Sequence, residues 1–264
     1  MFHGEGSYAF IMGIISGYPV GAKIVNKFVE EGTCSKSEAE RMLAFTNNSG
    51  PLFIIGTVGI SLFGDTTIGI ILFITHVIAC LTVGLIFGFI SKHSWIKNKR
   101  NYKNDSISQN YNISDLGTIL SNSITNAIST ILLIGGFIVL FSIIISILNS
   151  LNIIDSIANI LSCFQVPTDL GKSIVTGLLE LTNGVNSVSL LHTKKMSLQI
   201  IITAFLLGFA GFSIFLQIFS IASKNNLSMK PYLIGKILQG FIASFYTFII
   251  LNLFDFFYFN LWNN

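Results

Sequence analysis

Four short stretches rich in glycine and hydrogen-bonding side chains interrupt the apolar segments of this sequence. They read "SGYPVGAK" (residues 16–23), "TNNSGP" (46–51), "ELTNGVNS" (180–187) and "GFAGFS" (208–213). In lipid, unpaired backbone and side-chain polar groups are costly, so such breaks are tolerated where they face protein, a cavity or a bound solute. We therefore predict that these stretches form a solute-binding site.

The stretch "TNNSGP" predicts a break in the middle of a membrane segment. Its hydrogen-bonding side chains are those of Thr46, Asn47, Asn48 and Ser49. Gly50 permits unusual dihedral angles, and Pro51 fits the first turn of a new half-helix. The free N–H groups of such a half-helix suit an anion. The alternative is a loop between a surface helix, "SKSEAERMLAF", and a membrane helix starting at Pro51.

The stretch "SGYPVGAK" predicts the tip of a re-entrant hairpin, with Ser16 and Gly17 at the turn. Tyr18 could contact a substrate or seal the hairpin, and Lys23 could supply positive charge if it reaches the cavity. The second arm, "AKIVNKFVEEG", carries several charges. The alternative is therefore a cytoplasmic helix that follows a short membrane segment.

The two later stretches supply the second half of the predicted site. Glu180 lies in an apolar segment, where an ionisable side chain suggests an ion path. It is our candidate for proton coupling, and the alternative is a neutral Glu180 that holds the tip together by a hydrogen bond to Thr182 or Asn183. The fourth stretch offers Gly208, Gly211, Ser213 and Gln217. Small residues also let ordinary membrane helices approach closely.

The histidine and cysteine side chains outside these four stretches do not indicate a catalytic or metal-binding site. His76 lies in an uninterrupted apolar segment, where it could form a hydrogen bond between helices or act as a proton relay. His192 is expected at the membrane interface. Cys34, Cys80 and Cys163 are far apart, which indicates core residues. The sequence has no metal-ligand spacing, P-loop or GxSxG motif. We expect no enzyme, catalytic residue, metal or cofactor.

The composition places these breaks in a membrane protein. Of 264 residues, 52% are hydrophobic and only 10% are charged, against about 25% in ordinary soluble domains. Lipid is the natural solvent for such a chain, and membrane lipid is its first expected partner. The net charge of +3 is too small to indicate nucleic acid.

The apolar segments predict an all-α polytopic membrane protein. Four apolar segments are long enough to span, Thr66–Ser91, Ile124–Leu148, Ser197–Ser223 and Pro231–Phe254. Three further segments, Ser7–Ala22, Met42–Gly64 and Ser173–Leu191, are broken near their middle. The segment Ile153–Phe164 is too short to cross and is expected at the interface. The fourth stretch marks a break within Ser197–Ser223.

The segment order indicates two repeats, each with a re-entrant hairpin, a broken helix and an intact helix. The breaks at Tyr18–Gly21 and Thr182–Asn186 are about 164 residues apart, and Gly50 and Gly211 differ by 161. The predicted organisation is a first repeat (1–91), a cytoplasmic polar loop (92–114), a linking helix with an interfacial segment (115–170) and a second repeat (171–264). One crossing between the repeats would invert the second relative to the first.

The distribution of basic residues agrees with this inversion. Twelve fall on one predicted side: Lys23, Lys27, Lys36, Arg41, Lys92, Lys97, Lys99, Arg100, Lys103, Lys224, Lys230 and Lys236. Three fall on the other: Lys172, Lys194 and Lys195. The first side is therefore predicted to be cytoplasmic. Inverted repeats with broken helices are typical of secondary transporters.

Longer stretches carry a family resemblance. "SGYPVGAKIV", "EAERMLAFTNNSGPLFIIGTVG", "LLELTNG" and "GFAGFSIFLQ" resemble the sporulation integral membrane proteins with the nucleoside-recognition (Gate) domain, over nearly the whole chain apart from 92–114. That family is related to concentrative nucleoside transporters. The resemblance carries over Ser16, Gly17, Tyr18, Pro19, Gly21, Lys23, Thr46, Asn47, Ser49, Gly50, Pro51, Glu180, Thr182 and Asn183.

The resemblance implies movement of dipicolinate, the pyridine dicarboxylate of spores, across the outer forespore membrane. We expect a secondary transporter of a small organic anion. The alternatives are a nucleoside transporter and a non-transporting membrane scaffold for spore assembly. Members of the family usually have further helices before "SGYPVGAK", so either the chain is a fragment or a separate subunit supplies them. A homo-oligomer also remains open.

Overall fold

The computed structural model describes residues 4–92, 116–163, 166–191 and 196–262, and every regular element in these ranges is a helix. The elements are α1 (Gly4–Ser16), α2 (Val20–Glu30), α3 (Lys36–Thr46), η1 (Leu52–Leu62), α4 (Thr66–Lys92), α5 (Leu116–Ser150), α6 (Ile153–Ser162), α7 (Thr168–Leu179), α8 (Leu181–Ser189), α9 (Met196–Phe209), α10 (Gly211–Ala222), η4 (Ser223–Asn225) and α11 (Lys230–Trp262). The expected all-α class is confirmed for these residues.

Four stretches are long and apolar enough to cross a membrane: Thr66–Ile90, Leu116–Ser150, Met196–Asn225 and Lys230–Leu253. They coincide with the four predicted spans, although the second begins at Leu116 rather than Ile124. The third contains a kink between α9 and α10, as the glycines predicted. Helix α6 is short, in agreement with its assignment as a segment that does not cross.

Local sequence signals fix the ends of the interrupted helices. Helix α3 begins with a capping box, in which the Ser35 side chain accepts from the Glu38 N–H and the Glu38 carboxylate accepts from the Ser35 N–H. Pro51 precedes the first residue of η1. That element is a π-helix, which is wider than the α-helical half-segment expected there. It ends before Gly64, whose φ is +70°.

The same order of elements occurs twice. Two short helices, an interrupted pair and one long helix follow one another as α1, α2, α3, η1 and α4, and again as α7, α8, α9, α10 and α11. The first residues of α1 and α7 differ by 164 in number, as do those of α4 and α11. Helices α5 and α6 lie between the two series in sequence.

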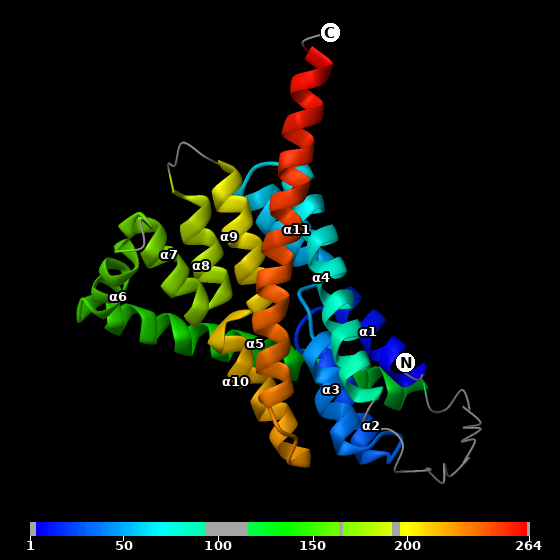
Figure 1. The fold of residues 1–264 in the computed structure, drawn as a ribbon. Coiled ribbons are helices and arrows are strands. Elements are labelled where there is room, and N and C mark those ends of the chain that lie inside the picture. The colour runs from blue at the N-terminus through cyan, green and yellow to red at the C-terminus, as the bar shows by residue number, and fades with distance from the viewer. Residues whose placement is uncertain (1–3, 93–115, 164–165, 192–195, 263–264) are drawn as a thin grey trace.

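Corresponding long helices run in opposite directions. Figure 1 shows α4 and α11 side by side, with the chain colour advancing downward along α4 and upward along α11. Their hydroxyl groups meet where Thr82 lies 3.0 Å from Tyr246 and where Thr247 donates to Thr75 at 3.0 Å. The two largest buried apolar clusters surround this pair and the interrupted helices.

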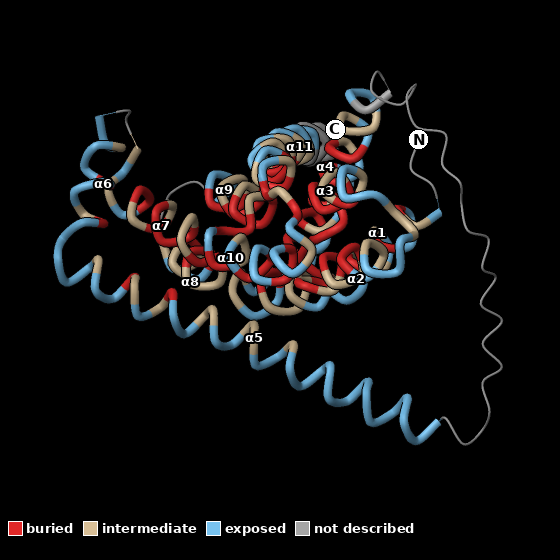
Figure 2. The backbone as a smooth tube through the Cα atoms, turned by 90° about the horizontal axis from the view of Figure 1, so that it is seen from below, coloured by how far each residue is buried: buried red, intermediate tan, exposed pale blue. Residues whose placement is uncertain are grey.

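Helix α5 differs in orientation from the predicted crossing segment. Figure 2, viewed nearly along α11, shows α5 lengthwise and exposed over most of its length. It lies crosswise to α4 and α11 because its contacts are with α6, α7 and α10 rather than with the long helices. Two hydrogen bonds attach it to the short helices: Lys23 Nζ donates to Thr130, and Asn183 donates to Ser142 at 2.8 Å.

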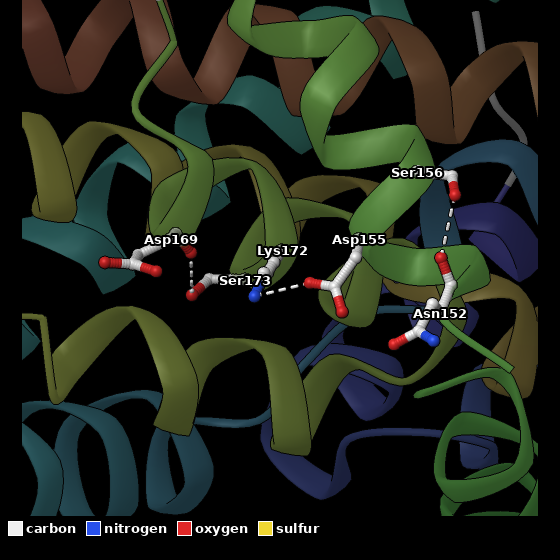
Figure 3. Close-up of polar contacts among 6 residues, drawn as sticks. All are labelled: Asn152, Asp155, Ser156, Asp169, Lys172 and Ser173. Atoms are coloured by element: carbon white, nitrogen blue, oxygen red, sulfur yellow. Dashed lines mark hydrogen bonds and ion pairs between the residues drawn. The ribbon is translucent and has the colours of Figure 1, made fainter. Parts of the chain in front are cut away.

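Helices α6 and α7 form a hairpin that one ion pair bridges, and the other polar contacts drawn lie within α7 or within α6 and its N-cap (Figure 3). The Lys172 ammonium forms an ion pair with Asp155, and this hydrogen bond raises the pKa of Lys172. The Ser173 hydroxyl donates to the carbonyl of Asp169 at 2.9 Å. Both charged side chains are substantially exposed, so the pair contributes little to stability.

The basic residues require one correction. Lys236 was assigned to the cytoplasmic side, but the structure buries it to 1% exposure inside the helix pair, because neutral hydrogen-bond acceptors surround its ammonium. Residues 97–103 and His192, Lys194 and Lys195 lie outside the described residues, as does nearly all of the predicted loop 92–114.

Candidate functional site

The first tip is a turn between α1 and α2 at residues 17–19. Gly17 has a φ of +77°, which a side chain would strain. A Cβ on Gly17 would lie 3.2 Å from the backbone nitrogen of Gly50, so the tip touches the "TNNSGP" break directly. Gly21, predicted to belong to this break, instead lies within α2, where a Cβ would come within 2.2 Å of the Thr46 carbonyl oxygen.

The first break is an extended segment between α3 and η1. Thr46, Asn47 and Asn48 are fully buried. Asn47 donates to the Tyr232 hydroxyl at 3.4 Å, and Asn48 donates to Cys80 at 3.0 Å. Neither asparagine lines the cavity described below, because their side chains connect the break to α4 and α11. The first break is therefore buried inside the helix bundle.

The second tip breaks at Glu180, not at the predicted Thr182–Asn186, which is helical in α8. Glu180 has extended dihedral angles, and its carboxylate accepts from the Thr182 N–H at 3.0 Å and the Asn183 N–H at 2.7 Å. Because the carboxylate caps α8, the helix resumes immediately after Glu180. This geometry matches the structural role left open for Glu180 and leaves proton coupling untested.

The second break is centred on Ala210 and Gly211, with φ values of +73° and +77°. A Cβ on Gly211 would lie 3.0 Å from the carbonyl oxygen of Gly177 and 3.3 Å from the Leu181 nitrogen, so this break touches the second tip. Gly208, predicted at the break, lies in α9 and packs against Gly240 of α11. Its role is close helix packing.

Both tips, the first break and the start of α10 after the second break border one cavity of about 340 Å³, the size of a small-ligand site. Its polar or conformationally special lining residues are Ser16, Gly17, Tyr18, Ser49, Gly50, Glu180, Thr182, Ser213 and Gln217, all predicted from sequence. Ile134 and Ile138 of α5 add an apolar wall. Thus side chains separated by up to 201 positions in the chain meet around one space.

The other predicted residues lie beside the cavity or away from it. Thr46, Asn47, Asn48, Asn183, Gly208 and Gly211 belong to the surrounding framework and do not line it. Lys23 is also absent from the lining, because its ammonium is bonded to Thr130 of α5. The charge expected from Lys23 therefore does not reach the cavity.

The cavity has unused hydrogen-bonding capacity. Among the described residues, the Tyr18 hydroxyl, the Ser49 hydroxyl and the Gln217 amide nitrogen are buried without a hydrogen-bond partner. Buried polar groups are normally paired, so these atoms indicate room for a polar ligand. All three can donate to an oxygen of that ligand.

A buried polar cluster behind the first break was missed from sequence. Lys236 and Gln239 of α11 both donate to the Asn48 side-chain oxygen, at 3.2 and 3.0 Å. Gln239 also lies 3.5 Å from His76 Nε2 of α4, so His76 takes part in a helix-to-helix contact. The spacing of Lys236 and Gln239, three positions apart on one helix face, was the available signal.

Four stretches long and apolar enough to cross a membrane, one of them interrupted between α9 and α10, define a polytopic integral membrane protein. The chain is 33% identical over 263 residues to the sporulation integral membrane protein YlbJ of Bacillus subtilis (strain 168). The match covers 94% of this chain but 64% of YlbJ, a little under two thirds of that relative. No family model and no solved structure matches the chain.

Proposed function

We propose that this chain forms the substrate site of a secondary transporter for a small organic anion, with dipicolinate as the candidate substrate. The observation that carries this proposal is the meeting of two tips, the first helix break and the start of α10 at one cavity. Breaks at membrane depth are costly, and a bound solute is one of the few structures that compensates their freed polar groups.

The lining chemistry is compatible with a flat dicarboxylate. The Ser49 hydroxyl and the Gln217 amide can donate to carboxylate oxygens, and the Tyr18 ring offers a stacking surface. The N-terminus of α10, next to Gly211, adds a positive dipole end. The N-terminus of α8 is already occupied by the Glu180 carboxylate and is not available to a substrate.

Two further features support a transporter. The opposite directions of α4 and α11 agree with the inverted repeat expected of alternating-access proteins (Figure 1). The similarity to a protein named for sporulation supports a role there. The outer forespore membrane is the location that we propose for the chain. Glu180 lines the cavity and is our candidate for the coupled proton.

The test is dipicolinate accumulation in spores that produce the full-length protein at normal level. Asn47→Ala removes a framework contact at the first break, and Glu180→Gln removes the buried charge. Both variants should reduce accumulation strongly, whereas Asn122→Ala, on the exposed part of α5, should not. Wild-type accumulation in both variants would remove the site assignment.

A nucleoside is the second candidate substrate, and one observation favours it. The charged residue in the lining is the carboxylate of Glu180, and no lysine or arginine is among the lining residues. Carboxylate and amide groups suit ribose hydroxyls and base edges. Competition between uridine and dipicolinate for the purified full-length protein separates the two: displacement of bound uridine by dipicolinate supports the anion.

A further inference from the structure

Lys236 places a buried positive charge directly behind the first break. Its side chain is 1% exposed, and its ammonium donates to Asn48 Oδ1 at 3.2 Å and to Gln239 Oε1 at 2.8 Å. The same nitrogen lies 5.4 Å from the centre of the Tyr18 ring and 5.9 Å from that of Tyr232. All four partners are neutral amides or aromatic rings.

The charge of Lys236 has no acidic partner in the part of the chain that the structure describes. The ion pairs found there join Lys27 to Glu31 and Lys172 to Asp155. The remaining titratable groups around it are the Tyr18 and Tyr232 phenols, and His76 and Cys80 of α4. Burying an unpaired ammonium costs several kcal/mol, which a structural role alone does not explain.

The Tyr18 side chain lies between the cavity and the Lys236 ammonium. Tyr18 lines the cavity and also has its ring beside the Lys236 ammonium. Ser49, which follows the Lys236 partner Asn48 in sequence, lines the cavity with an unpaired hydroxyl. Because the Lys236 ammonium itself is buried, its charge is screened less by salt and water than a charge on the surface would be.

We propose that Lys236 is the residue that makes this cavity select anions. The inference rests on the proposed transport function and names the origin of its substrate charge. The ammonium attracts a carboxylate towards Tyr18 and Ser49 without contacting it, and it offsets the negative charge that Glu180 contributes to the same lining. Lys236 thus determines substrate specificity through the electrostatic potential that it produces in the cavity, without touching the substrate.

The experiment measures this potential without requiring transport. A reporter thiol is introduced by Ser16→Cys, at an exposed lining position of the full-length protein in which Cys34 and Cys163 are replaced by serine. Its rates of reaction with a sulfonate-bearing and a trimethylammonium-bearing methanethiosulfonate are compared. The anionic-to-cationic rate ratio should fall about tenfold or more in Lys236→Met and persist in Lys236→Arg.

Two further variants complete the design. Lys230→Met removes an exposed charge from the same helix and should leave the ratio unchanged. Gln239→Glu keeps the size of the side chain and places a carboxylate beside the ammonium, at the loss of the hydrogen bond that the Gln239 amide donates to Asn48. It should lower the ratio even if Lys236→Met does not fold. An unchanged ratio in Gln239→Glu and in any folded Lys236→Met would overturn the proposal.

Dipicolinate uptake into proteoliposomes separates this proposal from the function on which it rests. The wild-type protein could fail to accumulate dipicolinate while the rate ratio still depends on Lys236. That result would contradict dipicolinate as the substrate and would still support the role of Lys236 in anion selection. Uptake by the wild-type protein with a ratio independent of Lys236 supports transport and contradicts the role of Lys236.

Discussion

The carboxylate of Glu180 should stabilise the second tip, and replacing it tests whether that role is structural. Both carboxylate oxygens accept backbone N–H groups, from Thr182 at 3.0 Å and Asn183 at 2.7 Å. Hydrogen bonds to a charged group contribute about 1.5–3 kcal/mol each, and Glu180 is 1% exposed. In Glu180→Gln, one oxygen can still accept, but the amide nitrogen faces an N–H donor. We therefore expect a loss of about 2–3 kcal/mol.

Thermal unfolding of the full-length protein in detergent measures this loss. The thiol of Cys80 is fully buried, so its reaction with a maleimide dye reports unfolding in a background without Cys34 and Cys163. A loss of 2–3 kcal/mol corresponds to a fall in Tm of about 5–10 °C for a domain of this size. Glu180→Asp should stay within about 1 kcal/mol of the wild type, because aspartate is a favoured N-cap residue.

Uptake measured on the same variants separates structure from proton coupling. If the carboxylate acts as a cap, Glu180→Asp retains both stability and dipicolinate uptake, while Glu180→Gln loses both. A Glu180→Gln protein that melts with the wild type but transports nothing would refute the cap argument and assign the carboxylate to substrate or proton.

Two further predictions concern packing and surface charge. Gly21→Ala should destabilise the first tip by about 1–3 kcal/mol or more, because its Cβ would lie 2.2 Å from the Thr46 carbonyl oxygen, whereas Gly135→Ala, with nothing within 4 Å, should be neutral in the same unfolding assay. Lys172→Met should change the free energy of unfolding by less than about 1 kcal/mol, because its ion pair with Asp155 is exposed, and a larger loss in denaturant unfolding would contradict that estimate.

The positions of the membrane helices were predictable because lipid imposes a simple rule on composition. A span needs about 20 apolar residues, and the four long apolar stretches supply them with few charged side chains. The orientation of α5 was not predictable in the same way. Hydropathy reports that a helix is apolar, but its crosswise placement depends on contacts with α6, α7 and α10.

The breaks were predicted to within a few residues, and the errors have local physical causes. Glycine and asparagine marked the region after Glu180, yet the carboxylate itself ends one helix and caps the next. At the second break, Gly208 seemed equivalent to Gly211, but Ala210 takes the positive φ and Gly208 packs on Gly240. Composition identifies a break, whereas hydrogen bonds and contacts decide its residue.

Lys236 was missed because a lysine near the start of an apolar helix normally extends its charge to the interface. Sequence alone does not show that Asn48, 188 positions earlier, provides an acceptor in the core. The three-residue spacing of Lys236 and Gln239 becomes informative once α3 and α11 are known to touch. Long-range contacts of this kind are the part of the site that required the structure.

The two halves of the site have the same framework, but the buried side chains of Glu180 and Lys236 both belong to the second half. In both halves, a tip touches a break through backbone atoms: Gly17 against Gly50, and Gly211 against the carbonyl of Gly177. An offset of 164 residues relates α1 to α7 and α4 to α11. At this offset, the residue that corresponds to Glu180 is Ser16, and the residue that corresponds to Lys236 is Leu72. Neither buried charge therefore has an ionisable counterpart in the other half.

This asymmetry bears on mechanism. A framework repeated in two halves can change its access from one side of the membrane to the other, but it does not by itself choose a substrate. The choice falls to groups that differ between the halves, with Glu180 in the cavity lining and Lys236 behind Tyr18. Exchanging them for their counterparts, through Glu180→Ser and Lys236→Leu, should leave the helix breaks in place and remove the preference for anions. Retention of that preference would show that the neutral donors Ser49 and Gln217 suffice.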